Sequence, residues 1–385
     1  MDRGELTGWL RLALTPGVGD ASVRRLLAAF GPPEVIFAQP AAALRQLLTP
    51  AQVGALAQTP LALAQTLDAT LNWLAASGQD GAQHAFVTLG DARYPAALLA
   101  IEDPPPMLYL LGQLPGENPS PYPPALAVVG SRNPTPQGAL NARQFARALC
   151  EAGLTVVSGL ALGIDGAAHE GALQAAGGAL PSTIAVIGTG IDRVYPSHHR
   201  ELAHRIARQG LIVSEYSIGT PPLAANFPKR NRLIAGLALG ALVVEAAPQS
   251  GSLITARLAV EQGKEVFAIP GSIHSAQSRG CHQLIRQGAK LVETAQDVLE
   301  ELPQAARAMF GGAAEVPAPA PAAPDTVPDA DGLLRALGAD PVSLDALQAR
   351  TGLATPVLQA RLLELELQGQ LGRLPGGLFQ RLGQS

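Results

Sequence analysis

Residues 125–132 read Ala-Leu-Ala-Val-Val-Gly-Ser-Arg: five apolar residues, then a glycine, a serine and an arginine. A short apolar run without polar alternation predicts a strand that is buried on both faces. Six similar runs follow, separated by amphipathic stretches, at Leu154–Val157, Thr183–Ile187, Leu211–Val213, Ala241–Val244, Val266–Ile269 and Lys290–Val292. This alternation predicts an α/β fold: an extended, Rossmann-like, doubly wound and mostly parallel sheet with helices on both faces.

The segment before this core has a different character. Residues 1–80 predict helices from the spacing of their apolar residues, and Pro16-Gly17-Val18-Gly19 resembles a helix-hairpin-helix turn. The backbone amides of such a turn can hold a DNA phosphate, but the module also serves as a purely structural helical domain, and the sequence leaves both open. Residues 81–124 contain two Pro-rich connectors and lead into the core.

The segment after the core predicts a small separate domain. Three short helices, at Gly332–Leu337, Ser343–Thr351 and Thr355–Gln368, precede a hairpin at Leu371–Leu382, which together predict a winged helix. Residues 329–385 hold five arginines and six acidic residues, so we expect a protein-binding or regulatory role rather than tight duplex binding. The expected organisation is a helical SAM-like or helix-hairpin-helix-like domain (1–80), a connector and start of the core (81–124), a Rossmann-like domain (125–303), an Ala/Pro-rich linker (304–328) and a winged-helix-like domain (329–385).

Composition narrows the class of protein. No apolar run reaches the roughly 18 residues that a membrane span needs, and Met1–Glu5 does not read as a secretory leader, so we expect a cytoplasmic protein. Cys150 and Cys281 stand far apart with no histidine cluster nearby, which predicts no metal site. The net charge is −4, but residues 116–303 carry fifteen Lys and Arg against fourteen Asp and Glu. Phosphate binding requires a local field, so the overall charge does not exclude nucleic acid.

Small polar loops follow four of the predicted strands: Gly130-Ser131-Arg132, Ser158-Gly159, Gly188-Thr189-Gly190 and Ser250-Gly251-Ser252. The carboxyl ends of parallel strands meet at one edge of a sheet, where doubly wound folds bind their ligands. Glycine lets the backbone approach an anion, and helix N-termini point free N–H groups at it. We therefore predict a site for a phosphate-rich ligand, with Arg132 placed to hold a phosphate by two hydrogen bonds.

A basic hexapeptide, Phe227-Pro228-Lys229-Arg230-Asn231-Arg232, immediately precedes or opens the predicted helix Leu233–Leu239. Three cations at a helix N-terminus oppose the helix dipole, so the arrangement favours an anion bound nearby over a solvated charged turn. Phe227 fits two roles, stacking on a base or packing in the core.

Two histidine motifs are candidates for chemical sites. Asp165 and His169 stand four residues apart, a spacing that suits an acid–base pair or a loop brace, and we favour the brace. His198 and His199 are adjacent and point apart on a helix, which argues against a metal site. We predict no catalytic residue and no cofactor.

Taken in order, these motifs resemble the DNA-processing protein A family (DprA, also called Smf). The resemblance covers about residues 90 to 290 and rests on Tyr94-Pro95, Asp103–Pro106, Gly130–Arg132, Ser158–Ala161 with Gly163–His169, Gly188–Asp192 with Tyr195-Pro196, Ser214–Tyr216, Phe227–Arg232 and Ser250–Ser252 with Thr255-Ala256. It implies a protein that binds single-stranded DNA in natural transformation and recombination, protects incoming strands, loads the RecA recombinase and forms a homodimer. At most weak binding to double-stranded DNA and no membrane partner are expected.

The resemblance also implies roles for individual residues. Arg132 and Lys229 would be the principal phosphate contacts, with Arg230 and Arg232 nearby. The full expected DNA-binding set is Gly130, Ser131, Arg132, Ser158, Gly159, Gly188, Thr189, Gly190, Phe227, Lys229, Arg230, Asn231, Arg232, Ser250, Gly251 and Ser252.

The alternative is a nucleotide hydrolase of the lysine-decarboxylase-like phosphoribohydrolase type, which has a similar fold. Those enzymes carry Pro-Gly-Gly-x-Gly-Thr-x-x-Glu, and the corresponding stretch here, Pro248 to Thr255, is one residue shorter and aligns with the motif's Gly-Thr at Gly251-Ser252. It ends in threonine where the catalytic carboxylate should stand, so the cleavage lacks its general acid or base. A dehydrogenase is disfavoured because no Gly-x-Gly-x-x-Gly opens the first helix.

Overall fold

The structure is a computed structural model that describes residues 1–78, 81–114, 122–175, 177, 181–302, 332–338, 341–374 and 376–382. The linker expected at 304–328 lies outside these residues. No helix in the described ranges combines the length and the apolar character that crossing a bilayer requires.

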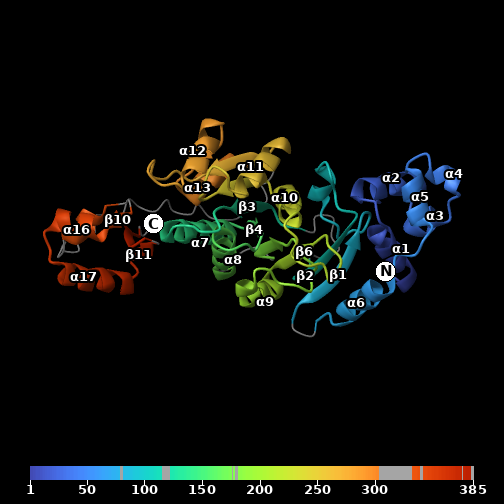
Figure 1. Cartoon of the computed structure of the whole chain (residues 1–385), viewed down its shortest axis with the longest axis horizontal. Coiled ribbons are helices and arrows are strands. Elements are labelled where there is room, and N and C mark those ends of the chain that lie inside the picture. Colours follow the sequence, from blue (N-terminus) through green and yellow to red (C-terminus); the bar gives the residue numbers. More distant parts are fainter. Residues whose placement is uncertain are drawn as a thin grey trace.

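A sheet of nine strands forms the centre of the described molecule, in the order β1-β2-β6-β5-β4-β3-β7-β8-β9 (Figure 1). The strands are β1 (Gln83–Thr88), β2 (Met107–Gly112), β3 (Ala125–Val129), β4 (Thr155–Ser158), β5 (Thr183–Val186), β6 (Leu211–Ser214), β7 (Gly240–Val243), β8 (Glu265–Ala268) and β9 (Lys290–Leu291). Pairing is parallel from β6 to β9, and every apolar run that predicted a strand forms one. The predicted fold class is confirmed.

An antiparallel edge extends the sheet beyond the prediction. β1 pairs with β2, and β2 pairs with β6, both antiparallel. These two strands lie in the segment 81–124, of which the sequence predicted only a connector and the start of the core. Their signal is weak because each is a single short run enclosed by Pro-rich connectors, without a helix to complete a βαβ unit.

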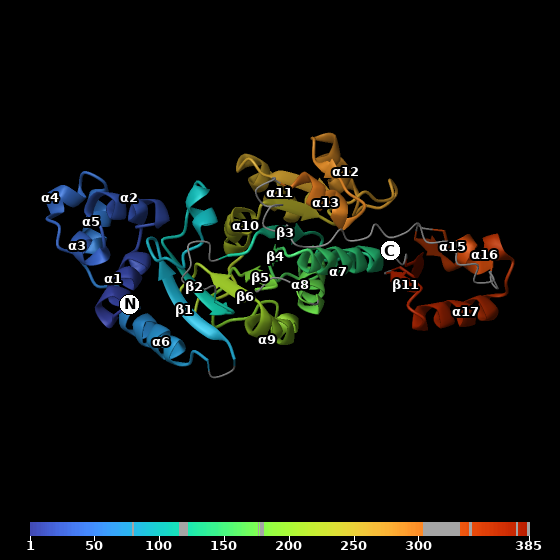
Figure 2. The ribbon, with the colours of Figure 1, turned by 180° about the vertical axis from the view of Figure 1, so that it is seen from behind.

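Helices cover both faces of the sheet, as Figure 2 shows from behind. One face is packed by α10 (Asn226–Leu237), α11 (Ser252–Glu261) and α12 (Arg279–Arg286). The other is packed by α7 (Pro136–Glu151), α8 (Ile164–Gln174), α9 (Arg200–Gln209) and α13 (Ala295–Glu301). Fully apolar strands such as β3, in which every residue is buried, follow directly from this three-layer arrangement.

The basic hexapeptide lies inside a helix. The expected helix Leu233–Leu239 is corrected, because α10 begins at Asn226 and the hexapeptide forms its first two turns. Pro228 does not prevent this, since the first-turn N–H groups of a helix have no intrahelical partner.

The N-terminal helices are α1 (Arg3–Leu14), α2 (Asp20–Phe30), α3 (Pro33–Phe37), α4 (Ala41–Leu44), α5 (Pro50–Leu56) and α6 (Leu63–Ala75). Leu6 of α1 and Leu67 of α6 share an apolar cluster with Phe86 of β1 and Tyr109 of β2. Helices α2 to α5 bury a separate small core around Leu26. The segment is therefore anchored to the sheet edge through α1 and α6, while α2 to α5 pack on one another and on Leu12 of α1.

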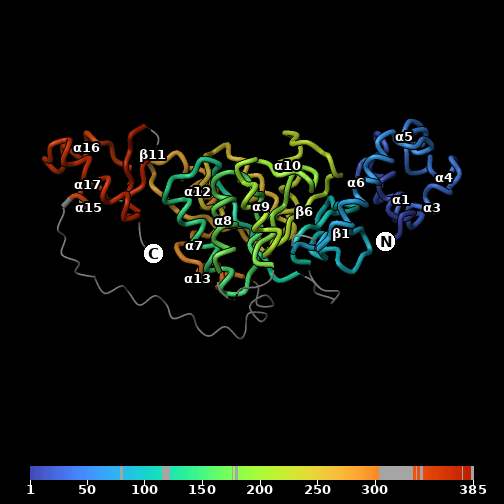
Figure 3. The backbone as a smooth tube through the Cα atoms, turned by 90° about the horizontal axis from the view of Figure 1, so that it is seen from below, coloured from blue at the N-terminus to red at the C-terminus, as the bar shows by residue number. Residues whose placement is uncertain are grey.

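The C-terminal segment has the predicted winged-helix architecture. It contains α15 (Gly332–Leu337), α16 (Leu344–Thr351) and α17 (Thr355–Leu367), with a small sheet of β10 (Val342–Ser343), β12 (Leu378–Arg381) and β11 (Leu371–Leu374). The predicted hairpin is β11–β12, although Pro375 at its turn lies outside the described residues. Figure 3 shows this segment at one end of the molecule and the N-terminal helices at the other.

Candidate functional site

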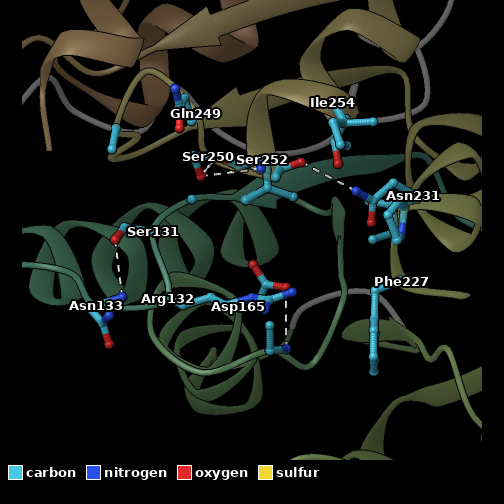
Figure 4. A pocket seen from close by; sticks show the side chains of 18 of the residues that line it. Ser131, Arg132, Asn133, Asp165, Phe227, Asn231, Gln249, Ser250, Ser252 and Ile254 are labelled. Atoms are coloured by element: carbon cyan, nitrogen blue, oxygen red, sulfur yellow. Dashed lines mark hydrogen bonds between the residues drawn. The ribbon is translucent and has the colours of Figure 1, made fainter. Parts of the chain in front are cut away.

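The site lies where the order of the parallel strands reverses. From β3 the sheet continues through β4 on one side and through β7 on the other, so the loops after β3 and β7 diverge and leave a crevice. A cavity of about 510 Å3 occupies this position (Figure 4). Its lining includes Gly130, Ser131, Arg132, Asn133, Asp165, Phe227, Arg230, Asn231, Gln249, Ser250, Gly251, Ser252 and Thr255. Three of the four predicted glycine-containing stretches and the basic hexapeptide thus meet at or beside one cavity.

The loop after β3 is held rigidly beneath Arg132. A Cβ at Gly130 would lie 2.8 Å from the carbonyl oxygen of Glu245, and Ser131 N donates to that same oxygen at 2.7 Å. Asn133 N donates to Ser131 Oγ at 3.1 Å. The Arg132 side chain is exposed, and no hydrogen bond or ion pair engages it within the described part of the chain. Its guanidinium is therefore available to an anion in the cavity.

The helix α10 presents one face to the cavity. Phe227, Arg230, Asn231 and Ile234 line it, and their spacing is that of neighbours on a single helix face. Phe227 contacts Tyr195 with ring centroids 5.4 Å apart, and Tyr195 is itself half exposed. Phe227 is thus at the rim of the cavity, partly buried, and not in the hydrophobic core.

Arg230 is buried beside the loop that follows β4. Only 4% of the residue is exposed, and its Nη2 donates to the carbonyl oxygen of Gly159 at 2.6 Å. Asp165 Oδ2 accepts from the N–H groups of Gly159 (3.2 Å) and Ala161 (3.4 Å) on the same loop. Burial raises the pKa of Asp165 and lowers that of Arg230, while the attraction between the two charges opposes both shifts. The two residues brace the loop between them.

The braced loop contains a strained residue. Leu160 has a φ of 57°, in the left-handed region that a residue with a Cβ rarely adopts. Its carbonyl oxygen lies 3.0 Å from His199 Nδ1. Such strain persists only where surrounding contacts over-determine the backbone, and it is common at ligand sites. Arg230, Asp165 and His199 supply those contacts.

Lys229 and Arg232 project from the other side of α10 and do not line the cavity. Arg232 forms a two-point ion pair with Glu215, with Nη1–Oε1 at 2.8 Å and Nη2–Oε2 at 2.7 Å. Lys229 Nζ lies 2.7 Å from Asp20 Oδ2 and 3.6 Å from Glu215 Oε2. The hexapeptide is therefore divided between two environments, because residues one or two apart on a helix face different directions.

The remaining predicted residues surround the cavity without lining it. Ser158 Oγ donates to the carbonyl oxygen of Val128 at 2.7 Å and is fully buried. Thr189 Oγ1 donates to the carbonyl oxygen of Arg193 at 2.9 Å. A Cβ at Gly188 would lie 3.1 Å from the ring of Phe227. The loop Gly188-Thr189-Gly190 therefore supports Phe227 from behind.

The brace interpretation of Asp165 agrees with its contacts. His169 Nδ1 lies 2.7 Å from Thr183 Oγ1, which itself donates to the carbonyl oxygen of Val156, so the imidazole donates to the hydroxyl. Burial lowers the pKa of His169 to about 3, which keeps the ring neutral. Asp165 and His169 thus serve different loops.

Several lining residues were missed at the level of sequence. Asn133 carried no pattern that distinguished it from ordinary loop residues. Asp165 was considered only as part of an acid–base pair or a brace, and Gln249 and Thr255 only as part of the hydrolase-like stretch and the family motifs. Their proximity depends on the crossing of loops from distant strands. In the described ranges, no group of three or more His, Cys, Asp or Glu side chains is placed to hold a metal ion.

Comparison with known proteins gives consistent similarities. A family model described as DNA recombination-mediator protein A matches residues 85–303, and one described as DprA winged helix domain matches residues 317–377. Protein Smf of Escherichia coli (strain K12) is 41% identical over 314 residues, 81% of this chain and 80% of that protein. DNA processing protein DprA of Streptococcus pneumoniae (strain ATCC BAA-255 / R6) is 49% identical over 217 residues, 56% of this chain and 73% of that protein.

Solved structures point the same way. The X-ray structure of DNA processing protein A from Streptococcus pneumoniae has a TM-score of 0.62 at 36% identity, covering 79% of this chain and 99% of that one. A structure described as giving insights into the unique single-stranded DNA binding mode of DNA processing protein A from Helicobacter pylori has a TM-score of 0.50 at 30% identity. It covers 57% of this chain and 98% of that one.

Proposed function

The chain belongs to the DNA recombination-mediator protein A family, and on that basis we propose that it binds single-stranded DNA along the carboxyl edge of its parallel sheet. The observation that carries the proposal is the unengaged guanidinium of Arg132 at a glycine-lined cavity, on the strand-order reversal where doubly wound folds bind ligands. The solved structures that resemble part of this chain include one described by its single-stranded DNA binding mode.

The chemistry of the cavity suits a nucleic-acid strand. Arg132 offers a forked donor to a phosphate, whereas the first N–H groups of α11 already donate to Ser250 and Gly251. Phe227 at the rim offers an aromatic face on which any base can stack. We assign the phosphate contact to Arg132 and the loop-bracing role to Arg230.

The wider function follows from family membership. We propose that the protein acts in the cytoplasm on incoming single strands in natural transformation, protects them, loads the RecA recombinase and works as a homodimer through the Rossmann-like segment. The proposal keeps the division into segments 1–80, 81–124, 125–303, 304–328 and 329–385, and gives the winged helix a regulatory or protein-binding role.

The proposal is tested by fluorescence-anisotropy titration of labelled single-stranded and double-stranded oligonucleotides at two salt concentrations. Arg132→Ala is compared with Arg147→Ala, which removes the same charge from the exposed pair that Arg147 forms with Glu151 on α7. We expect strand-selective, salt-sensitive binding that Arg132→Ala loses and Arg147→Ala keeps.

A negative result in this titration would favour the alternative function, nucleotide hydrolysis. Binding that is indifferent to Arg132→Ala would remove the proposed site, and nucleoside monophosphates would then be screened for hydrolysis. The buried Thr255 stands against that alternative, because it lines the cavity where a hydrolase needs a carboxylate.

A further inference from the structure

An ion-pair ladder joins the N-terminal helices to the core beside the proposed site. Its members alternate in charge, and consecutive members are in contact. Arg24 pairs with Asp103 at 2.6 Å, and Asp103 with Arg232 at 3.3 Å. Arg232 pairs with Glu215 at 2.7 Å, Glu215 with Lys229 at 3.6 Å, and Lys229 with Asp20 at 2.7 Å. The ladder is Arg24, Asp103, Arg232, Glu215, Lys229 and Asp20, three cations and three anions.

The last ion pair of the ladder is more exposed to solvent than the pair at its centre. The side chains of Arg232 and Glu215 are 11% and 3% exposed, so their pair is closed to an incoming ligand. The side chains of Lys229 and Asp20 are 41% and 30% exposed. Lys229 is thus the ladder's most accessible cation, and it stands one residue before Arg230 on the helix that borders the cavity.

We propose that Asp20 is a built-in competitor of nucleic-acid phosphate at Lys229. The inference rests on the proposed DNA-binding function and extends the contacts of the strand from the cavity to Lys229 on the adjoining side of α10. In the structure, the Asp20 carboxylate occupies the position on Lys229 that a phosphate oxygen would take, and the Tyr216 ring flanks the ammonium at 5.9 Å. A strand phosphate that binds Lys229 therefore competes with Asp20 for the ammonium charge.

The position of Asp20 makes this displacement local. Asp20 is the first residue of α2, which packs with α3 to α5 around its own small core. The apolar anchoring of the N-terminal segment to the sheet is made by α1 and α6. Because Arg24 on the same helix still pairs with Asp103, release of Asp20 loosens the first turn of α2 without undocking the helix or the segment. By linkage, any contact that stabilises the pair of Asp20 with Lys229 weakens DNA binding by the same free energy.

The expected size of the effect is modest. An exposed ion pair contributes little because water and salt screen both charges, so a phosphate can replace the carboxylate at small cost. We expect Asp20→Asn to tighten single-stranded DNA binding about two- to fivefold at low salt and less at high salt.

The experiment is a double-mutant cycle on the full chain, read by anisotropy with a single-stranded oligonucleotide. The variants are Asp20→Asn, Lys229→Ala and the two combined. Asp68→Asn is the matched control, because it removes one carboxylate from the same N-terminal segment, where Asp68 forms an exposed pair with Arg3. We expect tighter binding from Asp20→Asn, wild-type affinity from Asp68→Asn, and no effect of Asp20→Asn once Lys229 is alanine.

Two results would overturn the competitor role. One is an equal effect of Asp20→Asn and Asp68→Asn on affinity, which would mean that only the net charge of the protein matters. The other is an increase in affinity from Asp20→Asn that persists in the Lys229→Ala background. Thermal melting of each variant checks that it folds, and hydrogen exchange gives an independent readout on the wild type, where added single-stranded DNA should raise exchange at α2 amides.

Failure of this inference is separable from failure of the proposed function. If Arg132→Ala abolishes binding and Asp20→Asn changes nothing, the site stands and the competitor does not. If wild type does not bind single-stranded DNA at all, the proposed function fails first.

Discussion

The guanidinium of Arg230 and the backbone of Gly159 are in such close contact that a side chain at position 159 would have to displace the guanidinium. Nη2 donates to the carbonyl oxygen of Gly159 at 2.6 Å, and a Cβ on Gly159 would lie 1.6 Å from Nη1. The absence of a side chain at Gly159 leaves room for the buried Arg230 guanidinium. The hydrogen bond from this guanidinium in turn holds the loop after β4 at the edge of the cavity.

Gly159→Ala tests this contact. We expect the added methyl group to displace Arg230, to lower the free energy of unfolding by about 1–3 kcal/mol, and to weaken single-stranded DNA binding through the loop. Chemical denaturation and anisotropy measure the two effects. Gly54→Ala is the control, because Gly54 lies in the helix α5 with open space at its Cβ, and there alanine should stabilise slightly. Equal free energies of unfolding for the two variants would contradict the prediction that the contact of Gly159 with Arg230 stabilises the protein.

Arg132 and Arg230 should differ in the salt dependence of binding. A residue that contacts phosphate contributes about 0.7 to the slope of log K against log salt for single strands, so Arg132→Ala should reduce that slope by about this amount. Arg230→Lys should weaken binding while leaving the slope unchanged, because Arg230 acts through the loop. Titrations at four or five salt concentrations give the slopes, and a reduced slope for Arg230→Lys would reassign it as a direct contact.

His169 should make the protein sensitive to acid. Its pKa is held at about 3 by burial, below the ordinary value of 6.5, so the unfolded chain binds a proton more readily than the folded one. The free energy of unfolding therefore has its full value above about pH 6.5 and decreases as the pH falls toward 3. At pH 5 the decrease caused by His169 is about 2 kcal/mol.

His169→Asn isolates this contribution, since the amide can still donate to Thr183 but does not titrate. Unfolding free energies at pH 7.5 and pH 5 should fall less in this variant than in wild type. Parallel pH profiles of the two proteins would show that His169 does not cause the loss.

Glu215 should be far more important for stability than an exposed acid. Glu215→Gln leaves the buried Arg232 without its two-point partner, and breaking one partner of a buried pair costs about 3–5 kcal/mol. Asp68→Asn, which disrupts an exposed pair, should cost about 1 kcal/mol or less. Thermal and urea unfolding compare them, and similar losses from both would mean that the Arg232–Glu215 pair is screened by solvent.

Much of the architecture was readable from local patterns. The seven apolar runs from Ala125 onward became the parallel strands, because a strand buried on both faces needs apolar residues at every position. The hairpin and helices of the winged helix were readable for a similar reason, since turn and capping residues act within a few positions of one another. The edge strands β1 and β2 were missed because each is a single short run that pairs antiparallel, β1 with β2, and β2 with β6, which lies about 100 residues further along the chain.

The candidate site was readable only in part. Sequence alone determined which residue types follow the strands, so the loops of Gly130 and Ser250 and the basic hexapeptide could be assigned to one edge of the sheet. Tertiary structure decided how the hexapeptide is divided. The turn of α10 sends Arg230 inward to Gly159 and Asp165, and sends Lys229 and Arg232 outward to Asp20 and Glu215. Those partners come from segments up to 209 residues away, and a charged side chain acquires its role from the charges that folding brings within a few ångströms of it.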